Sequence, residues 1–128
     1  MANDFRDTSG VDSERCQFKC VDFFQMKEPM ADLIFDHTFL CAILPVQRPQ
    51  WASQMAALLN SGGLLICYMF PLNNHEDGPP WALSVEIYRD LLSDAFELVL
   101  QRELEPIEKF QKRLESEHKE MVSVWKRK

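Results

Sequence analysis

The amino-acid sequence predicts an α/β fold in which a mostly parallel sheet is flanked by helices in a three-layer sandwich. Two segments, residues 31–36 and 62–70, are apolar at consecutive positions and do not alternate. Such strands are typically covered on both faces, as in parallel sheets packed between helices. Between them, residues 49–59 have apolar side chains at helical spacing. The three segments together predict a β-α-β unit.

The composition indicates a single small domain. The chain has 128 residues, of which 46% are hydrophobic and 27% are charged, which is typical of a globular protein. Residues 1–15 are polar and charged and predict a flexible leader, so the ordered domain is expected over residues 16–128.

The charge balance argues against a nucleic-acid partner, because 14 basic and 20 acidic residues give a formal net charge of −6. No apolar run approaches the roughly 20 residues that a membrane helix needs, and the opening residues lack the pattern of a secretory signal. The sequence therefore predicts a cytoplasmic protein without a membrane contact.

The four cysteines are expected to be free thiols. Cys41 and Cys67 lie inside apolar stretches, where small hydrophobic residues belong. Cys16 and Cys20 have neither the spacing nor the companion ligands of a zinc site, so no metal is predicted.

The first half of the chain is expected to contain two strands and a helix. Residues 16–21 alternate apolar and polar and predict a strand that ends in a turn at Asp22. The strand over residues 31–36 follows. Pro49 suits the first turn of the next helix, which residues 62 and 63, both glycine, are expected to stop.

In the second half, a strand over residues 62–70 leads into a Pro- and Asn-rich loop over residues 71–80. Ser84 is expected to cap a helix that runs to Asp94, and residues 96–100 predict another strand. The Lys- and Glu-rich residues 105–120 predict a solvated helix with i,i+4 pairs, followed by an apolar return over residues 121–125.

Ligands of open parallel sheets bind outside the carboxyl ends of the strands. Three segments are expected there: residues 22–24, residues 36–38 and the loop over residues 71–81. The run over residues 32–43, the string over residues 48–52 and the loop that closes on Gly78-Pro79-Pro80 resemble the S-adenosylmethionine-dependent thiol, thiopurine and halide methyltransferases of plants and fungi. The resemblance covers residues 18–97 and, more faintly, residues 119–128.

The resemblance implies a class I, Rossmann-like methyltransferase fold with S-adenosylmethionine as its cofactor. It assigns no catalytic residue. By match to the family, Asp22 would accept a hydrogen bond from the adenine amino group and Phe23 would lie beside the adenine ring. The expected cofactor-binding residues are Asp22, Phe23, Phe24, Asp36, His37 and Thr38, and the expected substrate-binding residues are Pro71, His75 and Trp81.

Each of these residues also has a purely structural interpretation. Asp22 could cap a turn, and the phenylalanines could belong to the core. His37, which stands where the family usually has Tyr, could be a general base or a structural hydrogen-bonding group. His75 could be solvated, and Trp81 could close over a substrate or anchor its loop.

The family's glycine-rich cofactor loop would precede Asp22, where this chain has 21 residues, so the chain resembles the C-terminal part of a truncated methyltransferase. The strand over residues 31–36 is then expected to have an unpaired edge and apolar faces beside it, which favours a homo-oligomer or a complex with a full-length relative. Two functions follow from the sequence. One is a methyltransferase that acts on a thiol or a similar small soft nucleophile, and the other is a catalytically inactive binding or regulatory partner.

Overall fold

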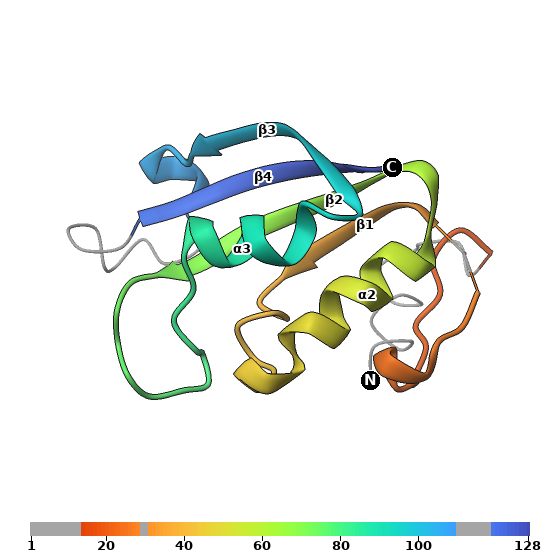
Figure 1. The fold of residues 1–128 in the computed structure, drawn as a ribbon, viewed down its shortest axis with the longest axis horizontal. Helices are drawn as coiled ribbons and strands as arrows, with labels where there is room; N and C mark the ends of the chain where they lie inside the picture. The colour runs from red at the N-terminus through yellow and green to blue at the C-terminus, as the bar shows by residue number, and fades with distance from the viewer. Residues whose placement is uncertain (1–13, 29–30, 110–118) are drawn as a thin grey trace.

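The computed structural model describes residues 14–28, 31–109 and 119–128. These residues form a four-stranded sheet in the order β1-β2-β4-β3 (Figure 1). The strands are β1 (Ala31–His37), β2 (Leu59–Leu72), β3 (Phe96–Glu103) and β4 (Lys119–Arg127). The helices are α2 (Arg48–Leu58) and α3 (Val85–Leu92), with short 3-10 turns η1 (Phe23–Gln25), η2 (Pro45–Gln47) and η3 (Pro106–Glu108).

The predicted β-α-β unit is confirmed by β1, α2 and β2, because β1 and β2 pair in parallel. The expected apolar stripe of the helix is buried: Trp51, Met55 and Leu58 are each 3% exposed or less. Strand β2 begins at Leu59, directly after the helix, so the chain turns before the two glycines and not at them.

The predicted capped helix and the strand after it are also confirmed. Ser84 accepts a hydrogen bond from the backbone N–H of Ile87 and thereby caps α3. Tyr88 and Leu92 of α3 are buried in the core together with Phe96, the first residue of β3.

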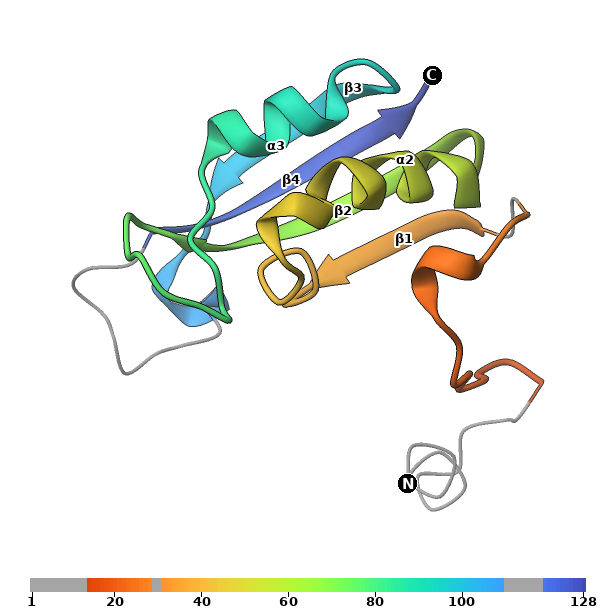
Figure 2. The same cartoon turned by 60° about the horizontal axis from the view of Figure 1, so that its bottom comes forward.

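Helices α2 and α3 lie on the same face of the sheet (Figures 1 and 2). The sheet is mixed, because β4 pairs antiparallel with both β2 and β3, whereas β1 and β2 are the only described strands that pair in parallel. The α/β class is confirmed. Within residues 14–28, 31–109 and 119–128, however, the structure shows one helical layer of the expected three-layer sandwich.

The core lies between the helices and the face of the sheet that they cover. The four cysteines are free, and Cys41 and Cys67 belong to this core. Burial raises the pKa of both thiols, so they remain protonated and act as small apolar side chains.

The expectation that β1 is covered on both faces is wrong for the described part of the chain. Leu33 and Phe35, which alternate with the core-facing side chains, are 52% and 56% exposed. Consecutive apolar residues indicate that both faces of a strand are suited to burial, but among the described residues helices cover only one face of β1.

The strand predicted over residues 16–21 is not formed. These residues have no regular structure, and Phe18 and Val21 are 42% and 57% exposed. An alternating pattern can form a strand only where a neighbouring strand offers hydrogen-bond partners, and no described strand pairs with these residues.

The solvated helix predicted over residues 105–120 is wrong at both of its described ends, while residues 110–118 lie outside the described residues. Pro106 begins the single turn η3, in which Glu108 accepts from the backbone N–H of Glu105. Lys119 already belongs to β4. No described helix is of the length and apolar character required to cross a bilayer.

We expect Ser84→Ala to destabilise the protein by about 1 kcal/mol, because the first turn of α3 loses its side-chain acceptor. Chemical denaturation followed by circular dichroism measures the change. Ser93→Ala is the matched control, since Ser93 lies at the exposed C-terminal end of the same helix and donates only to the Arg89 carbonyl. Equal losses for the two variants would contradict the capping role of Ser84.

Candidate functional site

The candidate site is organised around the turn that follows β1, residues 38–42. Thr38 has a positive φ of 61°, which reverses the chain at the end of the strand, and its hydroxyl donates to the carbonyl of His37. The backbone N–H of Ala42 donates to the carbonyl of Phe39 at 2.9 Å and closes the turn. We call residues 38–42 the hub turn.

The buried carboxylate of Asp36 holds the hub turn. Asp36 is 3% exposed, and its Oδ2 accepts from the indole Nε1 of Trp51 at 2.9 Å while Oδ1 accepts from the backbone N–H of Leu40 at 3.5 Å. Burial raises the pKa of the Asp36 carboxyl, and the hydrogen bonds from Trp51 and Leu40 oppose that rise. Both oxygens are thus used within the protein, so Asp36 acts on any ligand through the turn that it positions.

Asp22, Phe23 and Phe24 reach the hub turn from the side of β1. Asp22 caps η1, because its Oδ1 accepts from the backbone N–H of Phe24 at 2.9 Å. The amide of Gln54, on α2, donates to the carbonyl of Phe23 at 2.7 Å. The ring of Phe23 then packs edge-on against Phe39 of the hub turn, with ring centroids 5.0 Å apart. This segment therefore reaches the site without the preceding strand that the sequence predicts.

The loop over residues 71–81 reaches the hub turn from the other side. The backbone N–H of Trp81 donates to the carbonyl of Cys41 at 2.7 Å, and the carbonyl of Pro71 accepts from Leu83 at 2.9 Å. A Cβ at Gly78 would collide with the indole of Trp81, so glycine is required where the loop folds over that ring.

His75 braces this loop and is itself exposed. Its Nε2 contacts the carbonyl oxygen of Pro80 at 2.6 Å, and its Nδ1 contacts the side-chain oxygen of Asn73. The two contacts link the imidazole to Asn73 and Pro80 and so hold the two ends of this loop segment together. Arg48 adds a further tie, because its guanidinium donates to the carbonyl of Ala82 at 3.1 Å.

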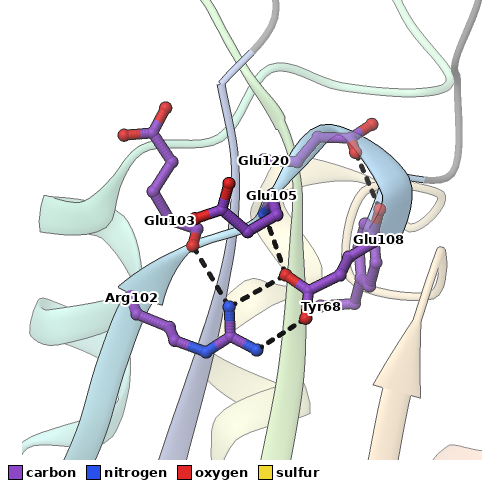
Figure 3. A network of polar contacts seen from close by, with 6 residues as sticks. All are labelled: Tyr68, Arg102, Glu103, Glu105, Glu108 and Glu120. Atoms are coloured by element: carbon purple, nitrogen blue, oxygen red, sulfur yellow. Dashed lines mark hydrogen bonds and ion pairs between the residues drawn. The ribbon is translucent and has the colours of Figure 1, made fainter.

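His37 leads away from the hub turn to a polar cluster on the face of the sheet without helices. Its ring centroid lies 4.8 Å from that of Tyr68 and 5.9 Å from that of Phe35. The hydroxyl of Tyr68 donates to Oε2 of Glu120 at 2.7 Å (Figure 3). Glu120 is 1% exposed. The sequence does not reveal Glu120 as a buried residue, because its position in a Lys- and Glu-rich run conceals that it belongs to a strand.

Figure 3 also shows the ion pair that fixes η3 beside this cluster. The guanidinium of Arg102 contacts both carboxylate oxygens of Glu108 at 2.9 Å. This pairing, together with the backbone N–H of Glu105, lowers the pKa of Glu108 to about 2. The pair is exposed, so it orients the turn more than it stabilises the fold.

The structure thus joins the three segments that the sequence places at this edge. Phe23 contacts Phe39, Asp36 anchors Leu40, and Trp81 bonds to Cys41. Two cavities lie elsewhere on the helical side: one of about 330 Å³ between α2 and α3, and one of about 190 Å³ between the end of β2 and the start of α3. Neither is lined by a predicted site residue. The described residues contain no group of three or more metal-ligating side chains.

The fold is that of the class I S-adenosylmethionine-dependent methyltransferases. A methyltransferase from Burkholderia thailandensis, solved with 1,6-didemethyltoxoflavin and S-adenosylhomocysteine, superposes with a TM-score of 0.71 at 16% identity, over 98% of this chain and 56% of that one. A methyltransferase from Methanosarcina mazei gives a TM-score of 0.68 at 15% identity, over 86% of this chain and 66% of that one.

The chain belongs to the thiopurine S-methyltransferase family, whose model matches residues 2–128. It is 44% identical over 72 residues to thiocyanate methyltransferase 1 of Brassica oleracea, covering 56% of this chain and 32% of the relative. It is 48% identical over 77 residues to probable thiol methyltransferase 2 of Arabidopsis thaliana, covering 59% of this chain and 34% of the relative. The chain therefore spans about a third of the length of these relatives. The family resemblance and its cofactor, S-adenosylmethionine, are confirmed.

We expect Trp51→Phe to destabilise the protein more at pH 7 than at pH 4. A carboxyl whose pKa is raised on folding adds stability at low pH and loses it as the pH rises through the raised pKa. Removing the indole donor raises the pKa of Asp36 further. The free energy of unfolding should therefore fall by about 2–4 kcal/mol at pH 7 and by about half of that at pH 4. Urea denaturation at the two pH values measures it.

Trp125→Phe is the control for this experiment. Trp125 is 2% exposed and its indole donates to the hydroxyl of Ser123, so the variant loses a similar volume and one hydrogen bond but leaves no carboxylate without its donor. The decrease in the free energy of unfolding caused by Trp125→Phe should be nearly independent of pH. A Trp51→Phe effect that is equally independent of pH would show that the Asp36 carboxylate does not depend on Trp51.

Proposed function

We propose that the chain is a methyltransferase, or the part of one, that moves a methyl group from S-adenosylmethionine to a thiol or a similar small soft nucleophile. The observation that carries this proposal is the hub turn, which brings residues 22–24, residues 36–38 and the loop over residues 71–81 to one edge of the sheet. The names of the thiol and thiocyanate methyltransferase relatives support the acceptor class.

The residues present fit the adenine end of the cofactor. Asp22 is exposed, and its Oδ1 caps η1, which leaves Oδ2 to accept from the adenine amino group. Phe23 and Phe24 are half-buried and offer ring surface for the adenine to pack against. In our proposal Thr38 and the backbone of His37 face the methyl-donating end of the cofactor, because the hydrogen bond between Asp36 and Trp51 fixes the hub turn.

When bound, S-adenosylmethionine supplies a methyl group on a positively charged sulfur. Bound there, the cofactor would donate this methyl group to an acceptor thiol, which would lose its proton to water. Positioning supplies most of the rate in such a displacement. In our proposal Pro71, His75 and Trp81 hold the acceptor, because the hydrogen bond to Cys41 keeps their loop against the hub turn.

The second candidate function is a catalytically inactive partner that binds a second copy of this chain or a full-length relative. One observation favours it: the outer edge of β1 pairs with no described strand. Either function is proposed for the cytoplasm.

We expect S-adenosylhomocysteine, the demethylated product, to bind the purified chain saturably in calorimetry. Asp22→Asn should weaken the affinity about tenfold, because the amide retains Oδ1 as the cap of η1 but replaces the free acceptor by a donor. Asp94→Asn, at an exposed position beyond α3, should leave it unchanged.

Failure of the folded protein to bind S-adenosylhomocysteine at millimolar concentration would refute the methyltransferase proposal. The inactive partner would then be the remaining function. Binding that both aspartate variants retain in full would refute the assignment of Asp22 alone.

A further inference from the structure

The smaller of the two cavities, about 190 Å³ in volume, lies where the end of β2 meets the start of β4 and the start of α3 (Figure 2). The strand register is broken beside it. Met69 of β2 pairs with Met121 of β4, but the next pair is Leu72 with Lys119, so β2 has a bulge here. The cavity therefore lies where the regular pairing of the sheet ends, at the edge where ligands of such sheets bind. We call it the β2-end cavity.

The apolar lining of the β2-end cavity is aliphatic and packs against the core. It consists of Leu72, Leu83, Val85 and Met121. Leu83 is 2% exposed, and the other three side chains are half-buried against the core. The position of Leu83 is fixed through its backbone N–H, which donates to the carbonyl of Pro71 at 2.9 Å. This part of the cavity is suited to the hydrocarbon portion of a small molecule.

The polar lining carries one positive charge and no carboxylate. It consists of Asn73, Asn74, Ser84 and Lys119. The ammonium of Lys119 forms no ion pair or hydrogen bond with another described residue. It is therefore available to a negatively charged group that enters the cavity.

The acidic residues next to this lining in the sequence do not take part in it. Glu120 follows Lys119, but its carboxylate is 1% exposed and accepts from Tyr68 on the face of the sheet without helices. Glu86 follows Val85, but it is exposed and does not line the cavity. The positive charge of the cavity is thus not matched by a carboxylate in its lining.

The larger cavity provides a contrast in charge. The space of about 330 Å³ between α2 and α3 is lined by Asp90 and Asp94 and by no cation. The chain as a whole has a formal net charge of −6. A cavity with a cation and no carboxylate therefore differs from the molecule around it, and Coulomb forces favour an anion there over the larger cavity.

We propose that the β2-end cavity binds a small aliphatic carboxylate, with the carboxylate at Lys119 and the hydrocarbon chain against Leu72, Leu83 and Met121. The size is suitable, because a cavity of roughly 150 Å³ holds benzene and a carboxylic acid of about six carbon atoms is of comparable size. The side-chain amide of Asn74 offers a further donor to the carboxylate oxygens.

The proposed carboxylate site adjoins the loop over residues 71–81 but does not depend on methyl transfer. Asn73 lines the cavity, and its side chain contacts His75 of that loop. No residue predicted to bind the cofactor or the acceptor lines the cavity. Carboxylate binding is therefore expected in the absence of cofactor.

Titration of the isotope-labelled full chain with hexanoate, followed by NMR of the backbone amides, tests the site. We expect the amide signals of Leu72, Leu83 and Met121 to shift saturably, with a Kd on the order of 1 mM. Hexanamide has the same hydrocarbon chain without the charge, so it should bind about fivefold more weakly.

Lys119→Met should weaken hexanoate binding about fivefold and leave hexanamide binding unchanged, because methionine removes the charge and keeps an unbranched side chain. Lys126→Met is the matched control, since Lys126 is an exposed lysine of the same strand that lines neither of the two cavities. Its affinity for hexanoate should equal that of the unmodified chain. Asn74→Asp adds a carboxylate to the lining and should weaken hexanoate binding at least as much as Lys119→Met.

Three results would overturn the proposal: no shift of the cavity signals at about 20 mM hexanoate, equal affinity for hexanoate and hexanamide, or equal weakening by Lys119→Met and Lys126→Met. The same samples are then titrated with S-adenosylhomocysteine. Hexanoate binding without S-adenosylhomocysteine binding would leave the carboxylate site intact and refute only the proposed methyl transfer.

Discussion

The hydrogen bond between the Trp51 indole and the buried Asp36 carboxylate is the constraint on which the rest of the site depends. It joins the end of β1 to α2 across the core, and the same carboxylate accepts from Leu40 in the hub turn. Removing a carboxylate from water is costly unless its oxygens are satisfied. The position of the hub turn therefore depends on the packing of α2. The two segments that contact the turn, residues 22–24 and the loop over residues 71–81, are positioned by it in the same way.

Elements whose signal is local could be predicted from the sequence. The stripe of Trp51, Met55 and Leu58 predicts α2, and Ser84 with its apolar spacing predicts α3, because helix periodicity and caps depend on residues within a few positions of one another. The resemblance supplied the class of fold. The predicted helices are formed in the structure because their signals do not depend on what surrounds each segment.

The remainder could not be predicted because it depends on neighbours that are distant in sequence. Residues 16–21 have the alternation of a strand but lack a partner strand. Glu120 sits in a charged run, yet Tyr68 of β2 buries it in a hydrogen bond. For Asp36, the sequence places a carboxylate at the expected ligand edge but does not show that Trp51, fifteen positions away, turns it inward. Each outcome is decided by a pairing across the sheet or the core.

The two sides of the sheet differ in what covers them, and this difference has a physical reason. The helical side is sealed by Trp51, Tyr88 and Trp125, so it can fix the hub turn without help from another molecule. The open side is held by strand pairing alone, and its side chains gain burial only through something added to it. Leu33 and Phe35 connect the two, because the strand that carries them ends at Asp36 and His37. Whatever covers the side chains of Leu33 and Phe35 would therefore contact the same strand that leads into the hub turn.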